Sequence, residues 1–121
     1  MKAKQLIAVL SCTSFFVACS SDNSETLMDN PPVLGQVTYT QNVKAIIDNN
    51  CISCHAAVPR NGAPMPLVTY EQVQNAVQNR GLLNRISLSN GNSLLMPQGG
   101  PRLPQATIDI IIKWNQDGLL K

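Results

Sequence analysis

Five consecutive residues, Cys51-Ile52-Ser53-Cys54-His55, constrain this chain more than any other stretch. They contain two of its four cysteines and its only histidine. Residues three apart on a helical turn project from the same side, so a turn here directs both thiols to one place. The following residue, His55, brings its imidazole beneath them. The spacing therefore predicts a site at which three reactive or ligating side chains converge.

Two cysteines separated by two residues and followed by histidine are the pattern of covalent haem c attachment. In this interpretation Cys51 and Cys54 form thioethers with the two vinyl groups of one haem, and His55 coordinates the iron as its proximal ligand. A thioredoxin-like dithiol is one alternative, but it follows a strand in an α/β fold, and no strand is predicted before Cys51. A structural zinc site is another, but zinc needs four ligands and only these three are available.

Residues 1–18 are typical of an export signal. Lys2 and Lys4 precede an apolar run, residues 6–18, that is too short to span a bilayer. The run ends in the letters FVAC, which resemble the lipobox of bacterial lipoproteins with Phe in place of the usual Leu or Val. This resemblance implies cleavage before Cys19 and a lipid on its thiol. The alternative is an ordinary signal that is cut at about the same place.

Cleavage before Cys19 accounts for every cysteine. Cys12 leaves with the signal and Cys19 carries the lipid, so only Cys51 and Cys54 remain, and they are assigned to haem. Export also agrees with haem attachment, which takes place outside the cytoplasmic membrane. We therefore expect the chain on the periplasmic side of a membrane or on the outer membrane, held there by its lipid.

Charge excludes nucleic acid as a partner. The full chain has a formal net charge of +2, but its nine lysines and arginines form no basic run. Removal of Lys2 and Lys4 with the signal leaves no net charge. A neutral mature chain predicts weak electrostatic steering, and contact with redox partners through a small apolar patch.

Residues 19–36 and 37–121 differ in character. The first segment is polar, contains Pro31-Pro32 and shows no periodicity, so it is predicted to be a flexible tether. The second is predicted to be an all-α domain of three to five short helices around one covalently bound haem. It has only three aromatic residues, so we expect the cofactor to supply part of the core.

Apolar residues at helical spacing predict the main helices of the domain. The first, within residues 39–50, is expected to begin at Thr40 as N-cap and to end at the cysteine motif, with Val43, Ile46 and Ile47 inward.

The second is expected to open at a capping box of Thr69 and Gln72, to bury Val73, Ala76 and Val77, and to stop at Gly81. The last, within residues 105–118, is expected to bury Ile108, Ile111 and Ile112, with Trp114 at its flank as a core anchor and Gly118 at its stop. Between these two, residues 82–89 are predicted as a turn or short helix, Asn90-Gly91 as a turn, and residues 94–104 as irregular.

The second axial ligand of the iron cannot be another histidine of this chain. Met65 and Met96 are the methionines available in the domain. Met65 follows His55 closely, whereas the much longer stretch from His55 to Met96 leaves room for a helix over the haem and a loop onto its other face. Met96 is the preferred ligand, Met65 is the alternative or a core filler, and an open site is the third possibility.

The order of these elements resembles the small class I cytochrome c domains of bacterial membrane-associated and exported proteins. The motifs that carry the resemblance are CISCH, the Met-Pro loop LMPQGG and the terminal helix IDIIIKWNQDG, and it covers about residues 37 to 120. It implies haem c on Cys51 and Cys54, iron held by His55 and Met96, and an N-terminal helix that crosses the C-terminal one. Ile46 and Ile47 would then meet Ile111 or Trp114. One departure is Pro104, where relatives have a Ser or Thr N-cap; proline suits a first helical turn.

The function expected from these features is electron transfer by an exported monohaem cytochrome c, monomeric, between periplasmic or membrane redox partners. A haem-based ligand-binding or sensor module and an electron-relay subunit of a larger oxidoreductase are the alternatives. The chain has no catalytic constellation and is predicted not to be an enzyme. Arg60 and Arg102 are possible partners of the haem propionates, although solvated surface arginines are the commoner case.

Overall fold

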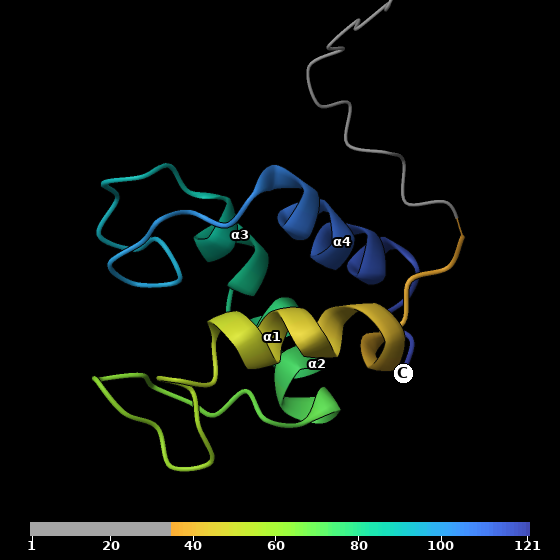
Figure 1. Cartoon of the computed structure of the whole chain (residues 1–121). Coiled ribbons are helices and arrows are strands. Elements are labelled where there is room, and N and C mark those ends of the chain that lie inside the picture. The colour runs from red at the N-terminus through yellow and green to blue at the C-terminus, as the bar shows by residue number, and fades with distance from the viewer. Residues whose placement is uncertain (1–34) are drawn as a thin grey trace, which may run out of the picture.

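The computed structural model describes residues 35–121, which form a small all-α domain (Figure 1). This part of the chain contains no strand, so the predicted fold class is confirmed at this level. Its helical elements are the π-helical segment η1 (Tyr39–Val43), α1 (Lys44–Asn50), α2 (Tyr70–Asn79), α3 (Leu82–Ser87) and α4 (Gln105–Gln116). The predicted signal, the lipidation site Cys19 and nearly all of the tether lie outside the described residues. Within them, no helix has the length and apolarity needed to cross a membrane.

The N-cap of the N-terminal helix lies two residues before the predicted one. Thr38, not Thr40, is the cap, and its hydroxyl accepts a hydrogen bond from the backbone N–H three residues later at 3.3 Å. This start includes Tyr39 in the helix and buries it on the same face as Val43, four residues on. Thr40 instead donates its N–H and its hydroxyl to the carbonyl of Lys121, at 3.0 and 2.8 Å. The prediction of Thr40 as N-cap is therefore wrong.

The middle helices follow the predicted pattern closely. The capping box at the start of α2 is confirmed, since Gln72 donates its N–H to the Thr69 hydroxyl at 3.3 Å and accepts from the Thr69 N–H at 3.1 Å. Val73 and Ala76 are fully buried, as predicted, whereas Val77 is only half-buried. Gly81, at a φ of +69°, ends α2 in the left-handed region that favours glycine, and α3 starts directly after it.

The C-terminal helix buries a different third residue from the one predicted. Ile108, Ile111 and Trp114 are its fully buried residues, whereas Ile112 is only half-buried. The prediction of Trp114 as a core anchor is confirmed, but the residue lies on the buried face of the helix and not at its flank. Its indole N–H donates to a carbonyl of the C-terminal tail at 2.7 Å, so the ring can be enclosed without an unpaired donor. Pro104 is the N-cap of α4 and precedes its first turn.

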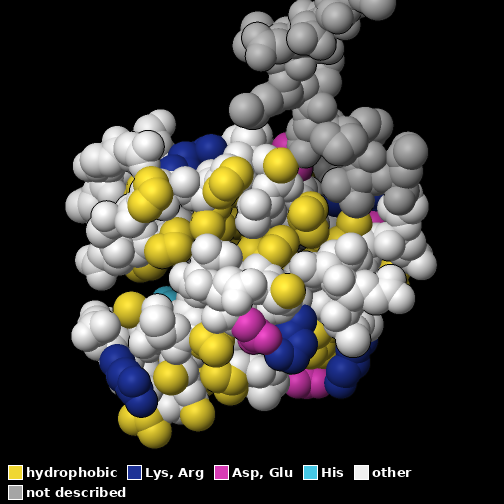
Figure 2. Space-filling view, in the orientation of Figure 1, with side chains coloured by type: hydrophobic (Ala, Val, Ile, Leu, Met, Phe, Trp, Pro, Cys, Tyr) yellow, Lys and Arg dark blue, Asp and Glu magenta, His cyan; other side chains and the backbone are white. Residues whose placement is uncertain are grey.

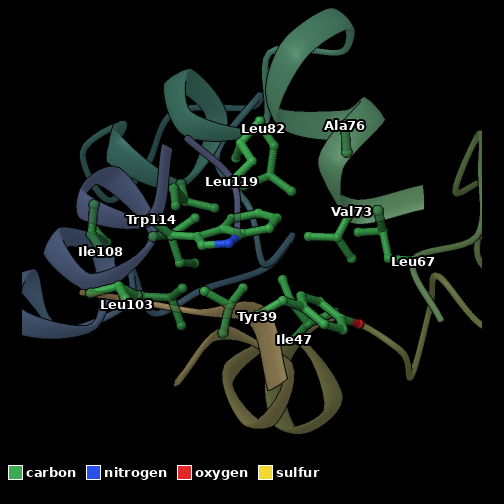
Figure 3. Packing of buried hydrophobic residues seen from close by; sticks show 14 residues of the cluster. Tyr39, Ile47, Leu67, Val73, Ala76, Leu82, Leu103, Ile108, Trp114 and Leu119 are labelled. Atoms are coloured by element: carbon green, nitrogen blue, oxygen red, sulfur yellow. The ribbon is translucent and has the colours of Figure 1, made fainter. Parts of the chain in front are cut away.

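Trp114 lies at the centre of one continuous core to which every helix contributes (Figure 3). Both tyrosines of the domain pack against it, with ring centroids 5.8 Å away for Tyr39 and 6.2 Å away for Tyr70. Ile47 and Ile111 belong to the same core. The three aromatic side chains of residues 35–121 thus form a single cluster in which the N-terminal and C-terminal helices meet.

The C-terminal tail fastens this cluster. The carbonyl of Leu120 accepts hydrogen bonds from the Tyr39 N–H at 2.8 Å and from the Trp114 indole at 2.7 Å. The carbonyl of Leu119 accepts one from the Tyr70 hydroxyl at 2.7 Å. As Figure 1 shows, the C-terminus accordingly lies beside the start of the N-terminal helix. The opposite end of α1 leads into the cysteine motif.

Candidate haem-binding site

The cysteine motif continues the helical course of α1 for one more turn. Cys51 caps α1 and donates its N–H to the carbonyl of Ile47 at 2.8 Å. Its own carbonyl then accepts from the N–H groups of Cys54, at 3.2 Å, and of His55, at 2.9 Å. As the spacing predicted, the turn brings Cys51, Cys54 and His55 to the wall of the same cavity.

This cavity has a volume of about 680 Å³. Ligand and cofactor sites in proteins typically measure about 300–1,000 Å³, so it can hold a large organic group. Its floor is formed by core residues, which include Ile47, Leu82, Ile86, Leu103 and Ile111. Figure 2 shows the surface hollowed between two groups of side chains, with the histidine at the edge of the hollow.

Two irregular segments enclose the cavity from the same end of the domain. One follows α1 and carries the cysteine motif and Met65, and the other precedes α4 and carries Met96. The two segments are far apart in sequence, but in Figure 1 they lie one above the other at the left. The structure therefore brings both predicted candidates for the second iron ligand to the cavity, each from a different segment.

His55 is held in a defined orientation by its own segment. Its Nδ1 atom lies 2.7 Å from the carbonyl oxygen of Met65. Because a carbonyl only accepts hydrogen bonds, Nδ1 must carry the proton, and the lone pair of the imidazole then resides on Nε2. A histidine that ligates a metal commonly has its second nitrogen bonded in this way. His55 is thus prepared to coordinate through Nε2.

The two methionines have different positions relative to His55. The main chain of Met65 lies against the His55 ring, on the side of Nδ1. Met96 comes from the opposite wall, where its N–H donates to the carbonyl of Arg85 at 3.1 Å. Both side chains are half-buried at the cavity. Met65 and Met96 thus reach the cavity from different segments, and only Met65 has its main chain bonded to the His55 ring.

The thiols do not suit the other two interpretations of the motif. Burial raises the pKa of Cys51 to about 11, whereas a redox-active dithiol needs a thiolate stabilised near neutral pH. Cys51 and Cys54 are both free thiols. Among residues 35–121, no three histidine, cysteine or acidic side chains gather closely enough to hold a metal ion. The raised pKa of Cys51 thus disfavours a thioredoxin-like dithiol, and the motif supplies only three of the four ligands that a structural zinc site needs.

The two arginines singled out from the sequence do not line this cavity. The Arg102 guanidinium is occupied by Gln105 Oε1 at 2.7 Å and by two backbone carbonyls, and Arg60 is exposed on the loop after the motif. Arg80 and Arg85 line the cavity instead. Sequence reasoning missed them, although the helix that buries Leu82 and Ile86 places Arg85 beside Ile86 at the same wall.

No protein-family model, curated protein or solved structure matches this chain. The site must therefore be interpreted from its own chemistry. It offers two sulfur nucleophiles on one turn, an imidazole with a free Nε2, a thioether from another segment, apolar walls and two cations. This combination suits a flat apolar cofactor that carries a metal and acidic groups.

Proposed function

We propose that this chain is an exported monohaem cytochrome c with a class I cytochrome c fold, which transfers electrons between periplasmic or membrane redox partners. The observation that carries the proposal is the convergence of Cys51, Cys54, His55 and Met96 on one cavity of about 680 Å³. These four side chains are the attachment and ligand set of a methionine–histidine cytochrome.

Each side chain has a defined part in this proposal. Cys51 and Cys54 hold the porphyrin by thioethers, and His55 and Met96 ligate the iron. Haem supplies a centre that accepts and releases one electron. The Met65 carbonyl keeps His55 in place, so the protein need not rearrange when the charge of the centre changes. The thioether of Met96 favours the reduced state and raises the potential.

The floor of the cavity suits a buried redox centre. Ile47 and Ile111 line it and are each 1% exposed, so they exclude water from one side of the bound group. Low solvent access around a haem raises its potential. A ring seated here also fills the volume that three aromatic residues leave unfilled.

Electron exchange with a partner requires part of the site to reach the surface. Val58 and Leu94 are the most exposed large hydrophobic residues of the described chain, at 76% and 53%. Val58 lies in the loop directly after the cysteine motif, and Leu94 lines the cavity. We expect a transient redox partner to contact exposed apolar side chains such as Leu94 at the mouth of the cavity.

The position of the site agrees with attachment to a membrane through Cys19. The described chain enters the domain beside Tyr39, and the whole of η1 and α1 lies between this point and the cysteine motif. At a rise of about 1.5 Å per residue, these two elements separate the point of entry from the motif by roughly 18 Å. A domain tethered at residue 36 therefore presents its redox site away from the tether.

Haem attachment tests the proposal directly. The full chain is expressed together with a haem-attachment system, and the protein is then denatured and separated from free haem. We expect one haem per chain to remain bound. Cys51→Ala and Cys54→Ala should each leave a single thioether, and the double variant should lose all covalent haem. An unmodified wild-type chain would overturn the proposal, and rapid carbon monoxide uptake by the reduced wild-type protein would favour a ligand-binding function instead.

A further inference from the structure

The positive charges of the domain fall into two groups. All three lysines of residues 35–121 have acidic partners: Lys44 pairs with Asp48, Lys113 with Asp117 at 2.7 Å, and Lys121 with Glu71 at 3.3 Å. No arginine in this part of the chain forms an ion pair with a carboxylate. Charge is therefore compensated at the lysines and uncompensated at the arginines.

Two of these arginines come together at the cavity. Arg80 caps the C-terminal end of α2, and Arg85 lies in the last turn of α3, on either side of the left-handed Gly81. Both line the cavity, and no aspartate or glutamate lines it with them. Neither guanidinium makes a side-chain hydrogen bond within residues 35–121, in contrast to Arg102.

Two guanidinium groups without a carboxylate partner line the same cavity, and an anionic group of a ligand would suit them. Arginine binds carboxylates with two parallel hydrogen bonds, and this geometry distinguishes it from lysine. A ligand that suits this lining is apolar over most of its area and carries two carboxylates.

We propose that Arg80 and Arg85 bind the two propionate carboxylates of the haem, an inference that rests on the proposed function. They act as positioning residues, because neither touches the iron. By neutralising the propionates they reduce the negative charge that the iron experiences, which favours the reduced state. Arg60 and Arg102, which the sequence offered as possible propionate partners, do not line the cavity.

Reduction potentials of the haem-loaded full chain at a fixed pH test this assignment. Arg80→Gln and Arg85→Gln should each lower the midpoint, so that the ratio of reduced to oxidised protein falls about three- to tenfold at the potential where the wild type is half reduced. A tenfold change corresponds to 59 mV for one electron. Arg80→Lys and Arg85→Lys keep the charge, so their ratio of reduced to oxidised protein should lie close to that of the wild type. Arg60→Gln, the matched removal of another unpaired arginine, should change it less than twofold.

The 13C NMR resonances of the propionate carboxyl carbons give a second readout, which a purely structural role of the arginines would not alter. In the reduced protein these resonances should shift in Arg80→Gln and Arg85→Gln and stay in place in Arg60→Gln. The backbone contact of Arg85 with Met96 is unaffected by these substitutions. Should Arg85→Gln fail to load haem, Arg80→Gln and Arg85→Lys still decide the matter.

The outcomes distinguish the carboxylate assignment from the proposed cytochrome function on which it rests. Unchanged potentials and carboxyl resonances in haem-loaded Arg80→Gln and Arg85→Gln would overturn the carboxylate assignment and leave the cytochrome proposal standing. The carboxylate assignment would also be overturned if Arg60→Gln changed the potential and the carboxyl resonances as much as Arg80→Gln and Arg85→Gln do. A wild-type chain that retains no haem after denaturation would overturn both.

Discussion

The Nδ1 atom of His55 lies 2.7 Å from the carbonyl oxygen of Met65. The imidazole is thus oriented by a main-chain group, which no side-chain substitution removes while the loop keeps its course. The carbonyl of His55 also accepts a hydrogen bond from the Leu67 N–H at 2.8 Å. Two bonds therefore close the segment from residue 55 to residue 67 upon the histidine.

The first prediction concerns the two methionines at the cavity. In the haem-loaded ferric protein, Met96→Ala should abolish the weak long-wavelength charge-transfer band of iron bound to methionine. Met65→Ala is the matched control and should keep the band, because the Met65 backbone carbonyl, which holds His55, is retained. Loss of the band in Met65→Ala alone would reverse the assignment.

A second prediction concerns Trp114, which is fully buried and bonded to the tail. Trp114→Ala should lower the free energy of unfolding by about 3–5 kcal/mol, since it removes a large core side chain. Trp114→Phe keeps a ring and loses the indole N–H, so it should cost less. Denaturant unfolding of the haem-loaded protein measures both, and equal losses in the two variants would show that the hydrogen bond outweighs the packing.

The C-terminal tail provides a third prediction. Deletion of residues 119–121 removes the carbonyl acceptors of Tyr39, Tyr70 and Trp114 together with the buried side chain of Leu119. Each buried donor left unpaired costs about 1–3 kcal/mol, so the shortened domain should be severely destabilised. Lys121→Ala is the control, because it keeps the three carbonyls and removes an exposed ion pair with Glu71 and a cation–π contact with Tyr70. It should cost about 1 kcal/mol. Comparable melting temperatures for the deletion and the wild type would contradict this account.

A fourth prediction tests the turn between α2 and α3. Gly81 has a φ of +69°, and the space around its Cα is open, so Gly81→Ala meets strain in the backbone and no clash. The left-handed conformation costs a residue with a Cβ about 1–2 kcal/mol. Gly81→Asn should cost less, since asparagine tolerates this region better. Chemical denaturation checks both, and an alanine variant as stable as the wild type would contradict the assigned conformation.

The fifth prediction concerns acid stability. The Lys113 ammonium at 2.7 Å and the Val37 N–H at 2.7 Å lower the pKa of Asp117 below its ordinary value of 3.8. Because the folded state favours the carboxylate, its contribution is fully present above about pH 4 and is lost as the pH falls through the lowered pKa. Asp117→Asn should therefore flatten the fall in stability below pH 4, as followed by urea unfolding between pH 2 and 6. Lys113→Gln should flatten it partly, and an unchanged pH profile in both variants would refute the role of this pair.

Much of the helical framework could be predicted because local signals specify it. The Thr69–Gln72 capping box, the glycine stop at residue 81 and the end of α1 at the cysteine motif all depend on neighbouring residues. Thr38 could not be distinguished from Thr40 in this way. The choice depends on which threonine meets the carbonyl of Lys121, a contact between distant parts of the chain.

The candidate site likewise combines features that local sequence predicts with features that depend on distant parts of the chain. The convergence of Cys51, Cys54 and His55 follows from their spacing on one turn. The Met65 carbonyl behind His55 was not foreseen, because a backbone acceptor has no signature in the sequence. Arg80 and Arg85 were missed for another reason, since the turn at Gly81 decides which arginines reach the cavity.

The bonds at the start of the domain also determine how it carries a mechanical load. A pull on the chain at residue 36 passes through the Val37 N–H to Asp117, and through Tyr39 and Thr40 to the carbonyls of Leu120 and Lys121. All of these attachments lie at the end of the domain remote from the cysteine motif. Drag on a tethered domain would therefore strain the seam between its first and last segments, while the cavity stays outside the path of the force.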